Sequence, residues 1–262
     1  MRPFLARLRL LIHVLRAFWT TTVLYPFFDE TRRSRHIQTW SKKLLDICGV
    51  EIRIHHPERL SPKALIVSNH ISWLDIFLIH SVIPCHFIAK AEMASWPIIG
   101  SLAKNTGTLF LERRSARHLK NTLDSLVKYL KAREHCVFFP EGTTAKQGEP
   151  LPFHPNLFEG AIHAEMPVQP FALKYVNQDG EFEDAVDLSG DISMRESVNS
   201  ILGKGRIFAE LTLLPLIDSD GLNRKDLCEY SRKAIMAALS QAVQENRDRT
   251  PETRHGHSGV QQ

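Results

Sequence analysis

The chain has 262 residues, of which 43% are hydrophobic and 24% are charged. A chain of this length and composition can bury a substantial core, which excludes a disordered or low-complexity protein. Its four cysteines lie far apart and form no Cys-x-x-Cys pair: Cys48, Cys85, Cys136 and Cys228. This spacing argues against a disulfide framework and a cysteine-rich zinc site, and it fits a reducing compartment.

The first 43 residues carry a positive charge of their own. They contain nine Lys or Arg against two acidic residues, a net charge of +7, which leaves the rest of the chain at −3. A basic segment on a mildly acidic body indicates an anionic partner, either a membrane surface or a nucleic acid. Leu, Ile, Phe and Trp between the arginines favour a membrane, because an interfacial helix buries its apolar face while its arginines reach the headgroups.

The longest uncharged stretch of this segment, 17–28, has 12 residues, whereas a membrane-spanning helix needs about 20. The residues at its end, YPFFD, offer no small-residue site for a signal peptidase. We therefore expect a helix that lies in the membrane interface and does not span the bilayer. The alternative is a basic N-terminal helix that packs on the core.

Short apolar runs alternate with helical patterns through the rest of the chain. Alternating apolar residues at 50–54 predict a half-buried strand, and the continuous apolar run at 64–67 predicts a strand covered on both faces. Further elements follow in chain order: helix 73–82, strand 86–89, helix 97–102, strand 108–111, helix 115–132, strand 136–139, helix 157–164, strands 167–175 and 206–214, and helix 222–243. This alternation predicts an α/β fold with a mostly parallel or mixed sheet flanked by helices on both faces.

The same pass divides the chain into three parts. We expect an N-terminal membrane-interacting helical segment at 1–43, a catalytic domain at 44–246 and a loose C-terminal tail at 247–262. The middle part contains no internal repeat and no linker.

A histidine and an aspartate follow the second predicted strand. His70 and Asp75 are five residues apart, so on one continuous helix they would face different directions. They can meet if His70 lies in the turn before the helix and Asp75 in its first turn. The carboxylate would then hold one ring nitrogen as N–H and leave the other as a base. By itself a His and an Asp at this spacing favour a structural turn histidine over a catalytic base.

Two other sets of residues follow predicted strands. Glu141, Gly142 and Thr143 come after an apolar strand, and such a loop can present N–H groups and hydroxyls to an oxygen-rich ligand or form an ordinary turn. Lys90 and Arg113 each stand just past a strand, either as solvated surface cations or as anchors of a phosphate.

Together these pieces resemble the glycerolipid acyltransferase family typified by bacterial 1-acylglycerol-3-phosphate acyltransferases. The matching blocks are NHISWLD (69–75), FIAKAEMASWPIIG (87–100), GTLFLER (107–113), FPEGTT (139–144) and MPVQPFAL (166–173). The resemblance covers roughly residues 60–176, and the presence of all the blocks in order makes it specific.

The resemblance implies transfer of a fatty acyl group from acyl-CoA or acyl-carrier protein to the sn-2 hydroxyl of 1-acyl-sn-glycerol-3-phosphate, giving phosphatidic acid. His70 would be the general base and Asp75 would hold its tautomer. Acceptor binding would fall to Arg113, Glu141, Gly142 and Thr143, with Lys90 close to the phosphate. The thirteen histidines show no metal-ligand spacing, and we expect neither a metal nor a cofactor beyond the acyl-donor substrate.

One position departs from the family pattern. Members that act on lysophosphatidic acid commonly have Arg after Glu-Gly-Thr, and here that residue is Thr144. A hydroxyl cannot supply the charge-assisted pairing that an acceptor phosphate favours. Lys146 is a possible substitute for the cation. The loop also resembles that of some lyso-ornithine lipid acyltransferases, which makes a lyso-ornithine lipid the alternative acceptor.

Two readings from other classes stay open. One is a non-catalytic membrane lipid-binding protein, and the other is a thioester hydrolase in which His70 activates water. For the acyltransferase we expect lysophospholipid, acyl thioester and an anionic membrane surface as partners, with acyl-carrier protein as a further candidate and no nucleic acid. Its expected place is the cytoplasmic face of the inner membrane, as a peripheral or monotopic protein.

Overall fold

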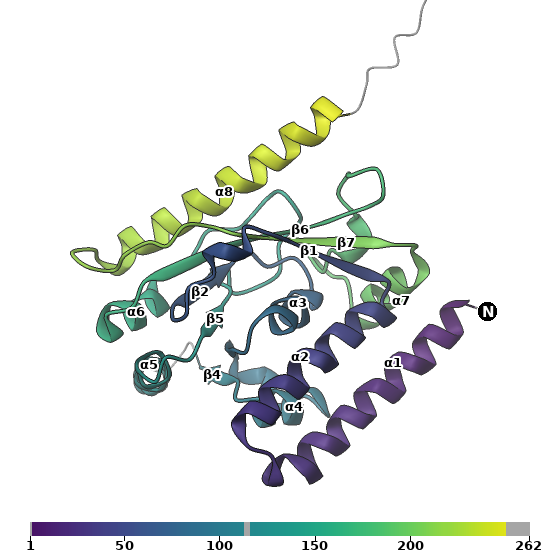
Figure 1. The fold of residues 1–262 in the computed structure, drawn as a ribbon, viewed down its shortest axis with the longest axis horizontal. Coiled ribbons are helices and arrows are strands. Elements are labelled where there is room, and N and C mark those ends of the chain that lie inside the picture. Colours follow the sequence, from purple (N-terminus) through teal and green to yellow (C-terminus); the bar gives the residue numbers. More distant parts are fainter. Residues whose placement is uncertain (1, 113–115, 250–262) are drawn as a thin grey trace, which may run out of the picture.

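The computed structural model describes residues 2–112 and 116–249. A seven-stranded sheet in the order β1-β7-β6-β2-β5-β3-β4 forms its centre (Figure 1). Neighbouring strands pair in parallel except β6 and β7, which are antiparallel. The strands are β1 (Val50–His55), β2 (Leu65–Ser68), β3 (His86–Lys90), β4 (Leu109–Leu111), β5 (Cys136–Phe138), β6 (Val168–Val176) and β7 (Ile207–Leu213).

Strand β2 shows why the sheet needs helices on both faces. All four of its residues are buried. Ile66 packs in a hydrophobic cluster on one face of the sheet, while Leu65 and Val67 pack in a second cluster on the other face. Alternating side chains of a strand point to opposite faces, so an unbroken apolar run is stable where both faces are covered.

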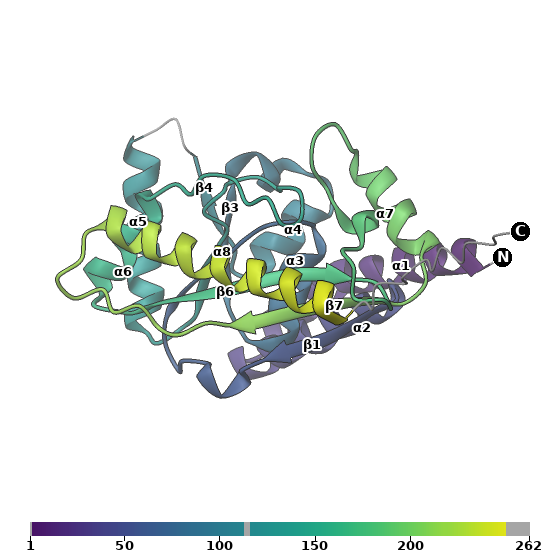
Figure 2. The same ribbon diagram turned by 90° about the horizontal axis from the view of Figure 1, so that it is seen from above.

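Helices form the two outer layers. They are α1 (Arg2–Trp19), α2 (Glu30–Ile47), α3 (Leu74–Val82), α4 (Ile99–Asn105), α5 (Ala116–Lys131), α6 (Glu159–Ala164), α7 (Met194–Gly203) and α8 (Arg224–Arg249). Helix α8 crosses one face over β6 and β7, while α2 and α3 lie on the opposite face with α1 outside them (Figures 1 and 2). The predicted α/β fold, with a mostly parallel sheet between helical layers, is confirmed.

The N-terminal helix is longer than the count of uncharged residues suggested. Helix α1 continues through a π-helical turn at Thr20–Leu24 and a 3₁₀ turn at Tyr25–Phe27. By length and composition, Phe4–Phe27 is able to cross a membrane, with a mean hydropathy of 1.2. The uncharged stretch counted in the sequence stops at Arg16 on its N-terminal side. The mean hydropathy of the longer segment stays high because it averages over such single charges.

Helix α1 has two different faces. Its inner face packs on α2, where the rings of His13 and Trp40 stack with centroids 4.7 Å apart and His13 Nε2 lies 2.9 Å from the Trp40 carbonyl oxygen. Its outer face carries exposed apolar side chains at the spacing of one helix side. We call these the apolar stripe of α1: Phe4, Leu5, Leu8, Leu11, Ile12, Leu15 and Trp19.

Helix α2 crosses the boundary that the sequence analysis placed between 43 and 44. Asp29 caps its start by accepting the Arg32 N–H at 2.7 Å, and the helix runs to Ile47. Leu44 and Leu45, in its last turns, are 1% exposed and belong to the main core. The expected boundary therefore falls inside α2, whose last turns pack in the core beside the sheet.

Three other elements differ from the sequence-based expectations. Helix α7 was not predicted, although the Ser193 side chain and Glu196 form a capping box at its start. Helix α4 begins two residues later than expected, after Ile98 with its positive φ of 62°. Helix α8 extends to Arg249, so the first residues of the expected tail are helical. Residues 250–262 lie outside the described part.

Candidate active site

His70 and Asp75 meet at the carboxyl end of β2. His70 lies in the turn after the strand, Asp75 is the second residue of α3, and His70 Nδ1 is 2.8 Å from Asp75 Oδ2. Because a carboxylate accepts hydrogen bonds, Nδ1 carries the proton and Nε2 is the acceptor nitrogen of the neutral ring. Among the described residues none bonds Nε2, and the His70 side chain is 16% exposed. The ring can therefore receive a proton from a bound molecule.

The Asp75 carboxylate is fully buried and held by four donors. Its Oδ2 also accepts the backbone N–H groups of Ile71 at 2.7 Å and Ser72 at 3.0 Å. Its Oδ1 accepts the hydroxyl of Tyr175 at 2.7 Å. These bonds satisfy a charge that would otherwise be costly to bury, and they fix the direction in which it faces His70.

Phe139 fixes the plane of the His70 ring. The two rings stack with centroids 3.9 Å apart and an angle of 8° between their planes. Phe139 in turn stacks on Phe87 of β3 at 5.8 Å. One face of the imidazole is thus covered by protein, and its freedom to rotate is restricted.

Glu141 faces the protein and not an open site. Its side chain is 3% exposed. One carboxylate oxygen accepts the His70 N–H and the other accepts the Leu151 N–H, each at 2.7 Å. Burial raises the pKa of Glu141, and these two hydrogen bonds oppose that rise. The resemblance assigns Glu141 to acceptor binding. In this structure its carboxylate links the loop of His70 to the loop of Leu151.

The next two residues form an open turn. Gly142 has a φ of +70°, which favours glycine, and its N–H donates to the Phe139 carbonyl at 3.0 Å. Thr143 is exposed. Of the three residues of this block that were expected to bind substrate, Gly142 and Thr143 remain accessible to a ligand.

Thr144, the residue that departs from the family pattern, holds a loop. Its hydroxyl donates to the Leu188 carbonyl oxygen, and the Leu188 N–H donates to the Ile71 carbonyl at 3.1 Å. The segment around Leu188 is thereby tied to both loops that carry the motif residues. Lys146, considered as a substitute cation, is 62% exposed and lies 3.7 Å from Glu149.

Lys90 and the approach to Arg113 lie at the same edge of the sheet as His70. Lys90 ends β3, is exposed, and pairs in register with Leu111 of β4. Since β2, β5, β3 and β4 are parallel, their carboxyl ends meet at one edge. Arg113 follows Leu111 by two residues and lies outside the described part of the chain.

Comparison with known proteins agrees with this arrangement. Residues 51–174 match a protein family described as Acyltransferase. The chain is 32% identical over 248 residues to the lyso-ornithine lipid O-acyltransferase of Pseudomonas aeruginosa, a match that covers 90% of this chain and 95% of that protein. This chain belongs to the acyltransferase family.

Two further similarities were found, one in sequence and one in fold. The acyltransferase is 30% identical over 210 residues to the 1-acyl-sn-glycerol-3-phosphate acyltransferase of Neisseria gonorrhoeae, covering 78% of this chain and 82% of that one. It shares its fold with the crystal structure of the 1-acyl-sn-glycerophosphate acyltransferase PlsC from Thermotoga maritima. That match has a TM-score of 0.61 at 20% identity and covers 90% and 97% of the two chains.

Three residues of the acyltransferase site escaped the sequence analysis. The Asn69 side chain makes two hydrogen bonds to the backbone of β6. It donates to the Leu173 carbonyl at 2.8 Å and accepts the Leu173 N–H at 2.9 Å. Gln147 accepts the Tyr175 N–H at 2.7 Å. Tyr175 itself binds Asp75. The signal available was the alternation in the predicted strand 167–175, which puts positions 173 and 175 on one face without naming their partners.

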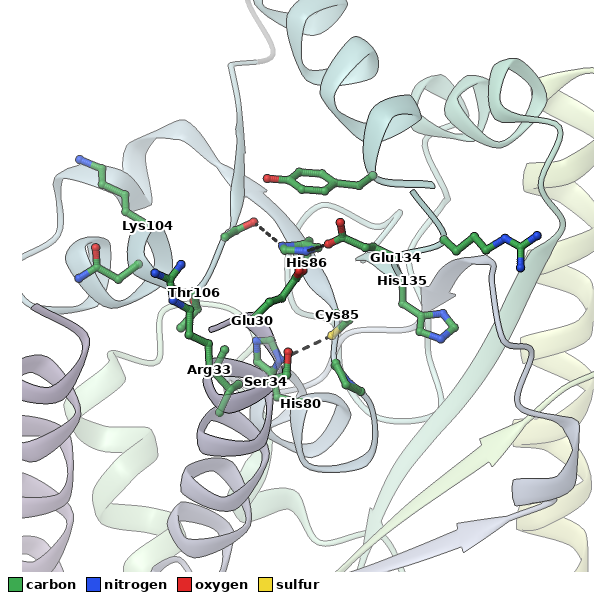
Figure 3. A pocket seen from close by; sticks show the side chains of 16 residues that line it. Glu30, Arg33, Ser34, His80, Cys85, His86, Lys104, Thr106, Glu134 and His135 are labelled. Carbon is green, nitrogen blue, oxygen red and sulfur yellow. Dashed lines mark hydrogen bonds and ion pairs between the residues drawn. The ribbon is translucent and has the colours of Figure 1, made fainter. Parts of the chain in front are cut away.

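A cavity of about 630 Å³ opens at the opposite edge of the sheet, where β3 and β5 begin. Figure 3 shows His86 pointing toward Glu134 and, at 3.1 Å, toward the Gly107 carbonyl. None of the described site residues lines this cavity. Within the described chain no group of three or more His, Cys, Asp or Glu is arranged to hold a metal.

Proposed function

We propose that this acyltransferase moves a fatty acyl group from an acyl thioester to the free hydroxyl of a lysolipid. The observation that carries the proposal is the His70–Asp75 pair, with Nδ1 bound to a fully buried carboxylate and Nε2 facing no protein partner among the described residues. A base held in this way can take a proton from a hydroxyl at neutral pH.

The proposed reaction needs no covalent enzyme intermediate. His70 Nε2 takes the hydroxyl proton as the acceptor oxygen bonds to the thioester carbonyl carbon. The carbon–sulfur bond then breaks, and the departing sulfur takes the proton back from His70 as a free thiol. Asp75 stabilises the imidazolium that exists between the two steps.

The cysteines and the serine nearest His70 support direct transfer. All four cysteines are buried. Burial raises the pKa of Cys136 to about 12 and that of Cys85 well above its ordinary value, so neither supplies a thiolate. Ser72, two residues after His70, is fully buried. The acceptor hydroxyl is therefore the nucleophile that we place against His70.

For the acceptor we propose 1-acyl-sn-glycerol-3-phosphate, acylated at its sn-2 hydroxyl to give phosphatidic acid. Lys90 at the edge of the sheet, with Arg113 beyond Leu111, supports a phosphate there. A lyso-ornithine lipid is the second candidate, because Thr144 is neutral and its hydroxyl is engaged by Leu188. For the donor we propose acyl-CoA or acyl-carrier protein, with no cofactor.

We place the enzyme on the cytoplasmic face of the membrane. The apolar stripe of α1 faces away from the body of the protein, while the opposite side packs on α2 through His13 and Trp40. This arrangement supports a helix that lies in the interface, since a spanning helix would leave the body it packs against. The net charge of +7 over residues 1–43 suits an anionic leaflet.

The decisive experiment uses a radiolabelled acyl thioester with lysophosphatidic acid or lyso-ornithine lipid as acceptor. We expect acylated lipid from the wild type and a loss of about 10²–10⁴-fold in turnover for folded His70→Ala. His55→Ala, at the exposed edge strand β1, is the matched control and should retain activity. Free fatty acid as the sole product would indicate a hydrolase, no product a lipid-binding protein, and wild-type turnover by His70→Ala would remove the mechanism.

A further inference from the structure

Tyr175 contacts Asp75 of the His70–Asp75 pair from a strand that is distant in the sequence. It lies on β6, is fully buried, and donates its hydroxyl hydrogen to Asp75 Oδ1 at 2.7 Å, across 100 residues of sequence. Burial and the neighbouring Asp75 carboxylate raise the pKa of Tyr175 well above its ordinary value. The phenol therefore stays a neutral hydrogen-bond donor at neutral pH.

The backbone around Tyr175 is fixed to the loops of the site. Two residues earlier, Leu173 exchanges two hydrogen bonds with the Asn69 side chain, next to His70. The Tyr175 N–H donates to Gln147 Oε1 at 2.7 Å, and Gln147 Nε2 donates to the Glu183 carbonyl at 3.1 Å. These bonds leave the phenol little freedom to move away from Asp75.

The oxygens of Asp75 have different partners. Oδ2 faces His70 Nδ1 and the backbone of the turn, while among the described residues Oδ1 has Tyr175 as its donor. A donor on Oδ1 fixes the torsion of the carboxylate and draws part of its negative charge away from the imidazole. Both effects act on His70 through Asp75.

We propose that Tyr175 is a positioning residue of the active site, whose hydroxyl orients Asp75 and sets how strongly His70 holds its proton. The proposal rests on the proposed role of His70 as the base. Without the hydroxyl, the carboxylate keeps more of its charge for the imidazolium, so the pKa of His70 should rise. The ring should also lose part of its fixed orientation, which lowers the rate of the chemical step.

The test is Tyr175→Phe, which removes one oxygen and keeps the ring. We expect kcat to fall about tenfold with KM for the acceptor changed less than twofold, as for a group that acts on the chemical step. We also expect the acidic limb of the pH profile and the NMR titration of the His70 ring to move to higher pH. A variant with lowered thermal stability but an unchanged His70 titration would overturn the proposal.

Tyr129→Phe is the matched control. Tyr129 stacks on His86 at the opposite edge of the sheet, with ring centroids 4.2 Å apart, so its variant should leave kcat and the His70 titration unchanged. If Tyr175→Phe fails to fold, 3-fluorotyrosine placed at 175 keeps the shape and gives a more acidic phenol. That stronger donor should move the His70 titration to lower pH, and an unchanged titration would again overturn the proposal.

A double-mutant cycle with Asp75→Asn separates action through Asp75 from other effects. We expect Tyr175→Phe to shift the His70 titration in the wild-type background and to leave it unchanged in the Asp75→Asn background. Equal shifts in both backgrounds would contradict the inference. Wild-type activity of His70→Ala would defeat the proposed function itself, whereas an inactive His70→Ala beside an unaltered Tyr175→Phe would defeat only the role of Tyr175.

Discussion

Glu141 holds His70 through the backbone: its carboxylate accepts the His70 N–H at 2.7 Å, while its other oxygen accepts the Leu151 N–H at the same distance. A residue in the loop after β5 thus positions the turn after β2. At 3% exposure the carboxylate has little surface to offer an acceptor lipid. Its place favours a role in building the site over a role in binding substrate.

Glu141→Gln tests this role. The single amide oxygen can accept one of the two N–H groups, so the other loses its partner, at a cost of about 1–3 kcal/mol in the free energy of unfolding. We expect kcat to fall about 10- to 100-fold, with little change in KM for the acceptor. Glu149→Gln, on the exposed part of the same loop, is the control. A large rise in KM with kcat preserved would instead place Glu141 against the acceptor.

Replacing Thr144 tests acceptor choice. Thr144→Arg adds a guanidinium and Thr144→Val removes only the hydroxyl, so both lose the bond to the Leu188 carbonyl. We expect Thr144→Arg to lower KM for lysophosphatidic acid about tenfold relative to Thr144→Val, because a guanidinium pairs with phosphate. The measurement is kcat/KM for lysophosphatidic acid and lyso-ornithine lipid. Identical ratios for the two variants would show that position 144 does not face the headgroup.

The two cations that the family resemblance assigns to the acceptor phosphate give a separate prediction. Lys90→Ala and Arg113→Ala should each raise KM about tenfold for a phosphorylated acceptor and leave kcat nearly unchanged, as expected when ground-state and transition-state binding fall together. Lys104→Ala, at the cavity on the other edge, is the control. An unchanged KM would assign the altered residue to the solvated surface.

Membrane contact is best tested on the surface of α1. Deleting residues 1–43 would cut α2 before Leu44 and Leu45, which are core residues, so loss of binding by that truncation would be ambiguous. Leu8→Ser, Leu11→Ser and Leu15→Ser together should instead weaken sedimentation with anionic vesicles at least tenfold, because each loses buried apolar area in the membrane. Leu216→Ser, at an exposed leucine elsewhere, is the control.

Salt dependence separates the two contributions to that binding. Vesicle binding by the wild type should fall as salt is raised from about 0.05 M to 0.5 M, since basic residues near a charged leaflet are screened. The triple serine variant should bind weakly at every salt concentration. Vesicle binding that changes neither with salt nor with the serine substitutions would exclude α1 as the membrane-contacting element.

Asp187 predicts how stability depends on pH. It is 8% exposed, and burial next to Asp184 raises its pKa from 3.8 to about 6. The folded state then holds this proton more tightly than the unfolded state, so the stabilisation is complete below about pH 4 and is lost as pH rises through about 6.

Asp187→Asn should remove this dependence. Between about pH 4 and 7 the wild type should lose up to about 3 kcal/mol in the free energy of unfolding relative to the variant, the equivalent of a two-unit shift in pKa. Urea unfolding of both proteins across this range measures the difference. A constant difference in stability would mean that Asp187 titrates normally.

The amino-acid sequence by itself determined the layered α/β fold and the local geometry of the His70–Asp75 pair. The all-buried run of β2 required helices on both faces, and the spacing of His70 and Asp75 required a turn before α3 for the two to meet. Both are local consequences of periodicity and of helix geometry. The five sequence blocks were enough to indicate the family.

Tertiary structure alone decided which distant groups complete the site. Tyr175 reaches Asp75 because β6 lies beside β2, and Asn69 fixes the register between them through Leu173. Whether Glu141 faces a ligand or the His70 backbone likewise depends on how two loops from neighbouring strands approach each other. Periodicity assigns a side chain to a face, but its partner there depends on strand order and register, which arise when the whole sheet packs.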